Sequence, residues 1–390
     1  MTVWDDVVGQ EQTVDRLREA ALAAGAVLRA ETGPATQAMT HAWLFTGPPG
    51  SGRSTAARAF AAALHCPHGG CAGCDACHTV LTGTHADVHV LSTELLSIGV
   101  KDTRDLVRRA ALSPAGGRWQ VIVMEDADRL TESAGNVLLK AIEEPADRTV
   151  WMLCAPAVED VLPTIRARCR HVRLRTPPVA AVADILVRRD GVDPEMAEYA
   201  ARTSGGHIGR ARRLATDGQA RARREQVLRI PARIDEVGGC LAAAQDLVTA
   251  ATEDAKGATE ELNARETEQL RTALGAATPT GRLPAGAGGA MKELEARQKK
   301  RATRLQRDAL DLALTDLASF YRDVLNLQFG SASALFNAEV AELVARQAAS
   351  TTPETTVRRL DAILACRRAI ATNVSPLLAV EAMTLSLRAG

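Results

Sequence analysis

The stretch AWLFTGPPGSGRSTAARAFAAAL (residues 42–64) decides the fold of this chain. Its apolar start is typical of a buried strand, GPPGSGRS (47–54) is a glycine-rich loop, and the alanine-rich remainder favours a helix. A strand, a glycine-rich loop and a helix in this order form a phosphate-binding loop, where backbone N–H groups and the helix N-terminus surround phosphate oxygens. Gly47, Gly50 and Gly52 allow the backbone to curl in this way. A plain Gly/Pro-rich turn before a helix is the weaker alternative.

The loop departs from the usual pattern at Arg53, which stands where a phosphate-binding loop has lysine. Arginine is longer, planar and forked, so the exchange is not conservative in a tight phosphate site. Ser54 is at the position that holds Mg²⁺, and Thr55 follows it in the first turn of the helix. We expect that nucleotide binding can survive this exchange and that efficient turnover does not. The pattern therefore predicts an altered site for ATP and Mg²⁺.

A second part of such a site follows the apolar run VIVM in VIVMEDADRL (121–130). Glu125 stands at the strand end where an aspartate normally holds Mg²⁺ through water, and Asp126 stands where a glutamate normally polarises the attacking water. The order of the two acids is inverted, and the side chain of Asp126 is shorter than that of glutamate. A buried strand that ends in solvated acids is the alternative interpretation, but the glycine-rich loop favours the nucleotide site.

Four cysteines lie close together in CPHGGCAGCDAC, with the spacing C-x4-C-x2-C-x2-C. Short C-x2-C turns direct two sulfurs toward one point, and four thiolates complete the tetrahedral shell of Zn²⁺. The spacing predicts a structural zinc site formed by Cys66, Cys71, Cys74 and Cys77, with no open position for catalysis. The alternative is four free thiols in a loop.

The first ~175 residues alternate between short apolar runs and amphipathic segments, which indicates a mostly parallel α/β sheet. The expected strands are 42–47, 87–91, 119–126, 149–155 and 170–175. The continuous apolar run at 121–124 favours a central strand that is buried on both faces. We therefore expect an α/β phosphate-loop domain over residues 1–176, with the zinc module at 66–77.

The rest of the chain has a helical pattern. Short helical segments predict a small three-helix domain over 177–222, and residues 223–390 contain no convincing strand. In the latter region a buried stripe is expected from helical spacing, at Leu310, Leu314, Leu317, Phe320 and Val324. The stretch at about 275–290 is rich in Gly, Pro and Ala without periodicity, so we expect a flexible loop inside this all-α C-terminal domain.

Composition limits the classes of function. The chain has 390 residues, of which 46% are hydrophobic, and its 47 basic and 47 acidic residues balance. A protein that acts alone on DNA often has a basic excess, so we expect any nucleic-acid contact to be local or shared with partners. No apolar run approaches the length of a membrane span, and the acidic start is not that of a secretory signal. We expect a soluble, cytoplasmic protein.

Together these motifs resemble the clamp-loader AAA+ family of bacterial DNA polymerase III over at least residues 1–215. The resemblance also rests on Val8, Gly9 and Gln10, which are similar to the segment beside the adenine, and on NVLLKAIEEP (136–145). The zinc module after the first helix is a hallmark of the gamma/tau and delta-prime subunits. The resemblance implies an AAA+ phosphate-loop domain, then a small lid domain, and a C-terminal collar through which the subunits oligomerise.

The segment TIRARCR (164–170) resembles the family's Ser-Arg-Cys motif, with Ala167 in place of the serine. The resemblance implies that Arg168 projects into the ATP site of a neighbouring subunit, where it stabilises charge that develops on the γ-phosphate. Cys169 matches the cysteine of the motif. Arg168 is thus the expected catalytic residue, acting in trans, and a surface arginine at a strand entry is the alternative.

Four departures within one site favour the delta-prime subunit over the ATP-hydrolysing gamma/tau subunits. Two are Arg53 and the inverted acidic pair. In addition, Ala155 and Pro156 replace the first sensor's hydroxyl or amide residue, and Gly209 aligns with the second sensor's arginine, with Arg210 one position away. The expected role is a stator that hydrolyses little or no ATP. Its implied partners are the gamma/tau and delta subunits, the sliding clamp and, through the complex, primer–template DNA, with no membrane contact.

Two other functions stay open on the sequence. One is an active gamma/tau-like ATPase, which hydrolysis by the isolated chain would favour. The other is a zinc-bearing nucleic-acid adaptor, which the balanced net charge does not support. Within the C-terminal region, the segment 292–307 has seven basic and two acidic residues. We interpret it as a solvated helix face, with DNA or partner contact as the sharper hypothesis.

Overall fold

The computed structural model describes residues 2–93, 95–274, 288–331, 334–372 and 374–390. They divide into two compact units, Met1–Thr93 with Ser97–Thr216 and Glu94–Leu96 with Asp217–Gly390. Most of the loop expected at about 275–290 lies outside the described residues, and residues 288–290 already belong to a helix.

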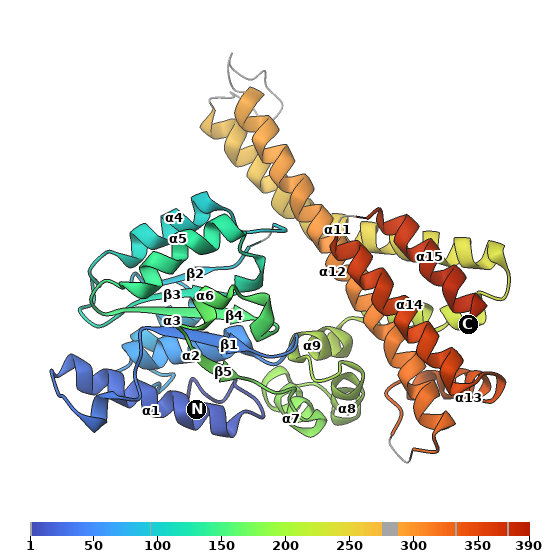
Figure 1. Cartoon of the computed structure of the whole chain (residues 1–390), viewed down its shortest axis with the longest axis horizontal. Coiled ribbons are helices and arrows are strands. Elements are labelled where there is room, and N and C mark those ends of the chain that lie inside the picture. Colours follow the sequence, from blue (N-terminus) through green and yellow to red (C-terminus); the bar gives the residue numbers. More distant parts are fainter. Residues whose placement is uncertain (1, 94, 275–287, 332–333, 373) are drawn as a thin grey trace. The chain divides into compact units, whose positions relative to one another are not determined.

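The first unit is built on a five-stranded sheet in the order β2-β3-β4-β1-β5, and every neighbouring pair is parallel (Figure 1). All five strands expected from the sequence are present. Their bounds are β1 (Ala42–Thr46), β2 (Val88–Leu91), β3 (Gln120–Met124), β4 (Thr149–Ala155) and β5 (Arg170–Arg173). Parallel strands need crossover helices, and these cover both faces of the sheet. The prediction of a mostly parallel α/β sheet is confirmed.

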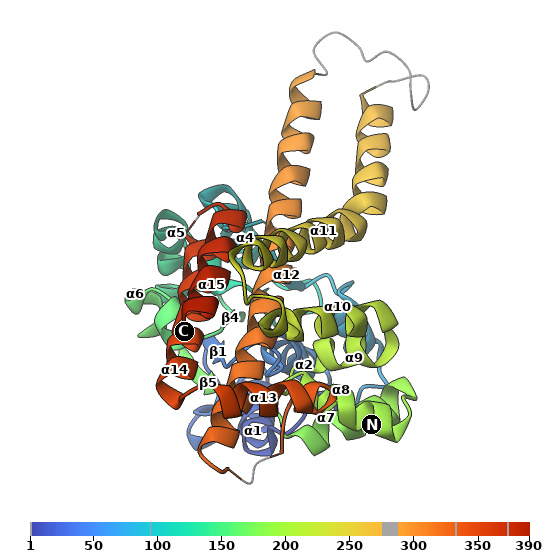
Figure 2. The ribbon, with the colours of Figure 1, turned by 90° about the vertical axis from the view of Figure 1, so that its right-hand side faces the viewer.

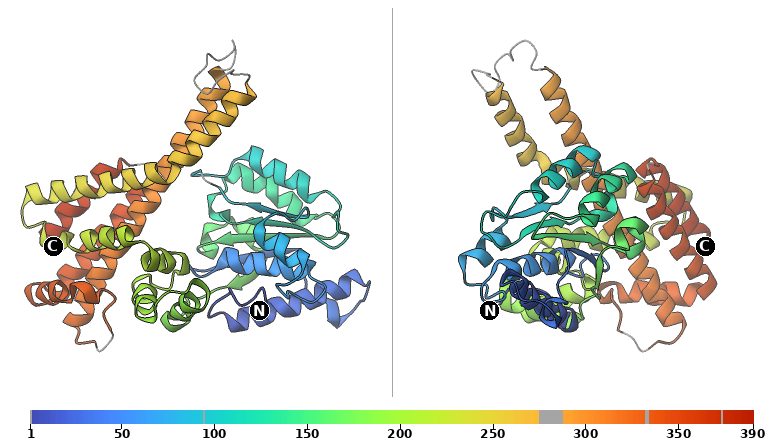
Figure 3. Two further views of the ribbon diagram at one scale, coloured as in Figure 1. Left: turned by 180° about the vertical axis from the view of Figure 1, so that it is seen from behind. Right: turned by 60° about the vertical axis from the view of Figure 1, so that its left-hand side comes forward.

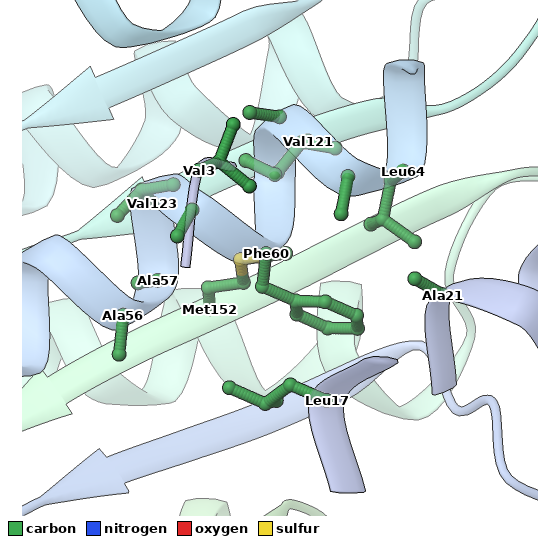
Figure 4. Packing of buried hydrophobic residues seen from close by; sticks show 14 of the residues in the cluster. Val3, Leu17, Ala21, Ala56, Ala57, Phe60, Leu64, Val121, Val123 and Met152 are labelled. Carbon is green, nitrogen blue, oxygen red and sulfur yellow. The ribbon is translucent and has the colours of Figure 1, made fainter. Parts of the chain in front are cut away.

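Strand β3 is buried on both faces, as its unbroken apolar run predicted. Val121 and Val123 join one hydrophobic cluster, whereas Ile122 and Met124 join the other, because successive side chains of a strand alternate between faces. Phe60 of α2 is fully buried in the first cluster, beside Leu17 and Met152 (Figure 4). Burial of a side chain of this size contributes about 2–3 kcal/mol, so α2 is held firmly on the sheet.

The helices of the first unit form two layers and a short C-terminal group. One face of the sheet carries α1 and α2, and the opposite face carries α4 and α5, as Figure 3 also shows. The last three helices of this unit, α7 to α9, follow β5 along the chain and pack on one another. The helices are α1 (Glu11–Leu28), α2 (Arg53–His65), α3 (Asp75–Thr82), α4 (Val100–Ala110), α5 (Glu132–Glu143), α6 (Pro163–Arg166), α7 (Val179–Asp190), α8 (Pro194–Thr203) and α9 (Ile208–Thr216).

The described residues of the second unit are helical, with short connections and no strand. The helices are α10 (Gly218–Leu228), α11 (Val237–Ala273), α12 (Gly288–Gln328), α13 (Ala341–Ser350), α14 (Pro353–Ala371) and α15 (Pro376–Ala389). The apolar stripe expected from Leu310 to Val324 lies fully buried in the core of this unit. Among the described residues, no helix has both the length and the apolar character that crossing a membrane requires.

Candidate functional site

The glycine-rich loop joins the end of β1 to the start of α2, as the sequence predicted. Gly50 and Gly52 have φ angles of 82° and 87°, a backbone region that favours glycine. A Cβ atom on Gly50 would lie 2.4 Å from the Cα of His207, just before α9, so no larger residue fits there. The loop therefore brings the N-terminus of α2 close to the segment that begins α9.

A cavity of about 310 Å³ opens at this N-terminus. Five of the expected residues line it together: Gly50, Gly52, Arg53, Ser54 and Thr55. The remaining lining residues come from the N-terminal segment and from α7 and α9: Asp6, Ile185, Arg189, His207, Ile208, Gly209 and Arg212. The cavity thus lies where the first turn of α2 presents unpaired N–H groups, which is a favourable place for an anion.

Val8 and Gly9 line a different cavity, of about 400 Å³, between the N-terminal segment, α1 and α7. Gln10 is buried, and its side-chain amide donates a hydrogen bond of 2.6 Å to the carbonyl oxygen of Arg175. Its amide oxygen accepts one from the backbone of Arg175 at 3.1 Å. Gln10 therefore fastens the N-terminal segment to the chain beyond β5, and these residues and the loop glycines do not share one cavity.

The guanidinium of Arg53 turns back onto its own loop. Its Nη1 donates a hydrogen bond to the carbonyl oxygen of Gly47. Burial lowers the pKa of Arg53, and the nearby carboxylates of Asp126 and Asp128 act in the opposite direction. The group remains a cation, since arginine does not lose its proton in proteins. Part of its hydrogen-bonding capacity is thus used inside the loop.

The two acids at the end of β3 each have a protein partner. Glu125 Oε1 accepts a hydrogen bond of 2.9 Å from Nε of Arg58, on α2, and Nη2 of the same guanidinium also lies 2.9 Å from it. Asp126 Oδ2 accepts the backbone N–H of Thr93 at 3.0 Å, and its other oxygen lies 3.8 Å from Nε of Arg129. The position expected to hold Mg²⁺ is therefore already paired with a cation. Arg58 was missed in the sequence, where its only signal is a charge within the alanine-rich helix.

Asp128 is a further acid near this site that the sequence did not single out. Burial raises the pKa of Asp128, and the neighbouring carboxylates of Asp126 and Asp160 act in the same direction. The nearby cation of Arg129 has the opposite effect and lowers the pKa of Asp128. Asp128 thus lies among other carboxylates, and the same acids also act on the guanidinium of Arg53.

Both candidate sensor segments lie near the loop. Ala155 is the fully buried last residue of β4, and the carbonyl oxygen of Pro156 accepts the backbone N–H of Gly47 at 3.2 Å. Gly209 lines the cavity beside α2, whereas Arg210 is not among the lining residues. The backbone N–H of Arg210 donates to Nδ1 of His207 at 3.2 Å. Neither sensor position therefore offers its own side chain to the cavity.

Two arginines of the cavity wall are paired with acids. Arg189 of α7 lies 2.6 Å from the carboxylate of Asp6, and Arg212 of α9 lies 2.8 Å from that of Asp190. Burial lowers the pKa of His207, and the cations of Arg210 and Arg53 add to this effect. No sequence pattern singled out these wall residues, because each pair joins separate segments of the chain.

Arg168 lies after α6, outside the residues that line the cavity of its own chain. Its Nη1 donates a hydrogen bond of 2.8 Å to the carbonyl oxygen of Thr164, and its Nη2 lies 2.5 Å from Oε1 of Glu143. The side chain is 40% exposed. An exposed ion pair of this kind contributes at most about 1 kcal/mol, so little free energy opposes its release.

The four cysteines converge between the end of α2 and the first turn of α3. Their sulfurs all lie within 4.8 Å of one another. Cys66 Sγ lies 3.6 Å from that of Cys71 and 3.7 Å from that of Cys74. These distances match the edge of about 3.8 Å that four sulfurs at 2.3 Å from a central zinc would have.

Backbone groups around Cys66 favour its thiolate. Burial acts against the charge, but the backbone N–H groups of Cys71, Gly70 and His68 outweigh it and lower the pKa of Cys66 to about 6. In the structure, the N–H of His68 lies 3.3 Å and that of Cys71 lies 3.4 Å from the sulfur. The donor set of four thiols and its geometry fit a closed, structural Zn²⁺ site.

A parallel sheet, a glycine-rich loop between β1 and α2, and acids at the end of β3, which β4 separates from β1, together define a phosphate-loop α/β domain. Residues 26–178 match the family model described as DNA polymerase III, delta subunit. Over these residues the chain is therefore similar to the clamp-loader subunits of DNA polymerase III, as its motifs predicted, and its relatives include delta' subunits.

Three relatives give the extent of the similarity. The delta' subunit of Pseudomonas aeruginosa is 36% identical over 195 residues, which are 48% of this chain and 59% of that protein. The delta' subunit of Bacillus subtilis is 31% identical over 166 residues, 42% of this chain and 50% of that protein. The gamma/tau subunit of Mycobacterium tuberculosis H37Rv is 33% identical over 202 residues, 50% of this chain and 33% of that protein. The chain thus spans between a third and three fifths of these relatives.

Among solved structures, a gamma subunit-related protein of DNA polymerase III from Thermotoga maritima aligns with 94% of this chain and 98% of its own. The sequence identity is 15% and the TM-score is 0.40.

Proposed function

We propose that this chain is a delta-prime-like stator of the DNA polymerase III clamp loader, which supplies Arg168 to the ATP site of a neighbouring subunit. Its partners are then gamma/tau and delta subunits, and the assembled complex places a sliding clamp on primer–template DNA. The observation that carries this proposal is the contrast between an altered phosphate loop and an exposed Arg168.

The altered loop supports a subunit that does not turn over ATP itself. Arg53 stands in place of lysine and bonds the Gly47 carbonyl, and Arg58 holds the carboxylate of Glu125. If Glu125 is to help hold Mg²⁺, its bond with Arg58 has to be given up. The N–H groups at the start of α2 still favour an anion, so the proposal allows nucleotide to bind without efficient hydrolysis.

Arg168 has the properties that an arginine finger needs. Its side chain is exposed and lies away from its own loop cavity, and within the described part of the chain its polar contacts are with Glu143 and one carbonyl group. A guanidinium that enters a neighbouring site stabilises charge on the transferred phosphoryl group. Glu143 can hold the side chain extended until a neighbour's phosphates replace its carboxylate.

The cysteine cluster has a structural part in this proposal. Cys66, Cys71, Cys74 and Cys77 would hold one Zn²⁺, which closes the segment between α2 and α3. Four protein ligands leave no position for substrate, so the metal has no role in hydrolysis. The site fixes the C-terminal end of the helix whose N-terminus forms the phosphate loop.

The test is DNA-stimulated ATP hydrolysis by a clamp loader reconstituted with Arg168→Ala in this subunit. Loss of an arginine finger reduces turnover at the affected site by about 10³-fold or more, whereas sites completed by other subunits continue. We therefore expect the ATPase rate of the complex to fall by the fraction that this one site contributes. Size-exclusion chromatography should show that assembly is unchanged. Unchanged ATPase would reject the proposed role.

Two further variants make this test specific. Arg166→Ala removes an exposed arginine two positions away on α6 and should leave the ATPase rate unchanged. Arg168→Lys keeps the charge but loses the planar fork, and we expect it to restore only a small part of the rate. Equal losses in Arg166→Ala and Arg168→Ala would indicate a general effect of basic charge on this surface.

The similarity to gamma/tau subunits supports a second candidate, an active ATPase. Ser54 lines the loop cavity and is at the position that would hold Mg²⁺. Brisk hydrolysis by the isolated, zinc-loaded chain, abolished by Ser54→Ala, would favour this candidate and exclude the stator without turnover.

A further inference from the structure

The outer parts of α11 and α12 form a two-helix arm, defined here as residues 252–273 and 288–308. Figures 1 and 2 show these parts of the two helices extending beyond the other helices of the second unit. The hydrophobic cluster of the unit reaches Ala251 on α11 and Leu310 on α12. The arm therefore lies beyond the main core, and its two helices need other contacts.

Polar contacts hold the two helices of the arm together. Arg301 is 3% exposed and donates hydrogen bonds to Glu266 at 2.7 Å and to Asn263 at 3.0 Å. Gln298 donates to the carbonyl oxygen of Asn263 at 3.1 Å, and Gln306 donates to Thr252 at 2.6 Å. A buried cation with several acceptors specifies one pairing of the helices, so one side of each helix is fixed inward.

The side of α12 that faces away from α11 is basic. Gln298 and Arg301 mark its inward side, and helical geometry turns Lys292, Lys299 and Lys300 away from it. These three lysines are exposed, and no ion pair to any of them is found among the described residues. We call these three residues the basic row.

The other helix of the arm carries the opposite charge. Residues 253–271 hold six acidic and three basic residues, against two acidic and seven basic in 292–307. Glu260, Glu261 and Glu268 are exposed on α11. The arm is therefore acidic on one helix and basic on the other, and the balanced charge of the whole chain hides a local cationic surface.

We propose that the basic row binds the phosphate backbone of double-stranded nucleic acid. Lys292 and Lys299 are seven residues apart, which is about 10.5 Å along a helix, and duplex DNA carries one charge per about 1.7 Å of its axis. Each cation of the row can therefore find a phosphate without a special register. Such contacts position a protein on a duplex without reading its sequence.

The composition of the arm favours a duplex over the other occupants. Proteins that bind single strands stack bases on aromatic side chains, and the arm has no Phe, Tyr or Trp. Protein–protein interfaces depend on buried aromatic or apolar anchors, and the basic row offers only charged groups. A repeated phosphate backbone needs no such anchor. This inference does not depend on the role of Arg168.

The experiment measures binding of the full chain to a fluorescently labelled duplex of about 25 base pairs by anisotropy, from 50 to 200 mM salt. The variant Lys292→Gln/Lys299→Gln/Lys300→Gln should bind at least tenfold more weakly at 50 mM salt. The slope of log K against log salt should fall by about 2.7, since each lost phosphate contact removes about 0.9. The corresponding triple change to Arg keeps the charges and should retain binding.

A matched control changes Glu260, Glu261 and Glu268 of the other helix to Gln, and this should not weaken duplex binding. Thermal unfolding curves that coincide with wild type show that the variants fold.

Absence of duplex binding by the wild-type chain at 50 mM salt, or equal binding by the Lys→Gln variant, would overturn the proposal. Tighter binding of a single strand than of the duplex would also overturn it. So would a variant that keeps duplex binding but no longer assembles with its partner subunits, because the row would then dock an acidic protein.

Discussion

At the scale of single residues, one exchange changes what the phosphate loop can do. A lysine at position 53 would extend a compact ammonium group toward the phosphates, whereas the guanidinium of Arg53 bonds the carbonyl oxygen of Gly47. Arg58, which lies on α2 like Arg53, adds a second change, because its guanidinium pairs with the carboxylate of Glu125. The loop backbone keeps its curl, since Gly50 and Gly52 have the left-handed conformations it requires.

This leads to a prediction for Arg53→Lys. The change frees the loop carbonyl and offers the usual cation to the phosphates, so affinity for Mg²⁺–ATP should rise. A charge-assisted hydrogen bond contributes about 1.5–3 kcal/mol, which corresponds to about tenfold to a hundredfold in affinity. Isothermal titration calorimetry of the isolated chain measures it. Adding Ser54→Ala should remove the Mg²⁺-dependent part, and an unchanged affinity in Arg53→Lys would show that Arg53 is not the obstacle.

At the scale of elements, strands and helices followed directly from apolar patterns. The run at 121–124 predicted a strand buried on both faces, and β3 contributes to both hydrophobic clusters. The stripe from Leu310 to Val324 predicted the buried face of α12. Local periodicity suffices in these cases, because the chain's own spacing decides which side chains are buried.

Contacts between distant segments could not be predicted in the same way. The approach of His207 to Gly50 and the pair of Asp6 with Arg189 join segments more than 150 residues apart, and neither segment alone shows a signal. The basic segment at 292–307 was interpreted as a solvated face, but Arg301 within it is buried against α11. The helical pattern of α12 alone cannot reveal this, because the partner that buries Arg301 lies beyond the Gly- and Pro-rich stretch.

The pairing of α11 with α12 gives a prediction at this scale. Arg301→Leu leaves Glu266 partly buried without its cation, and loss of such a partner costs about 1–3 kcal/mol. Hydrogen exchange in residues 256–271 and 291–307 should therefore become faster. The double variant Arg301→Leu/Glu266→Leu removes both partners and should exchange more nearly like wild type. If both variants exchange at the wild-type rate, Arg301 does not hold the arm together.

The same pair gives the arm a dependence on pH. Hydrogen bonds from Arg301 are the main cause that lowers the pKa of Glu266 below its ordinary value. A lowered folded-state pKa stabilises the arm above the ordinary pKa of glutamate, and the gain is lost as pH falls through the lowered value. Protection of the wild-type arm, corrected for intrinsic exchange, should therefore fall under acidic conditions. The double variant lacks this carboxyl group and should show a smaller change, and equal changes would contradict the assignment.

At the scale of the whole molecule, the two units have separate hydrophobic cores. The cysteine cluster belongs to the first, where Cys66 and Cys77 join the cluster on the α1 and α2 face of the sheet. The second unit buries its own set around α11, α12, α14 and α15. Damage to the metal site should therefore stay within one unit, because neither core includes residues of the other.

Zinc removal tests this separation. Without the metal, four thiols crowd one site, and binding free energy that contributes to the folded state of the first unit is lost. Differential scanning calorimetry of the full chain should show one transition that moves down after chelation or in Cys71→Ser, by about 2–4 °C for each kcal/mol lost in a unit of this size. The transition of the second unit should stay in place, and hydrogen exchange identifies which unit opens first.

Cys240→Ser, in the core of the second unit, provides the reverse control and should lower only that unit's transition. If chelation moved both transitions together, the two units would unfold as one cooperative body, and if it moved neither, the four sulfurs would hold no structural metal.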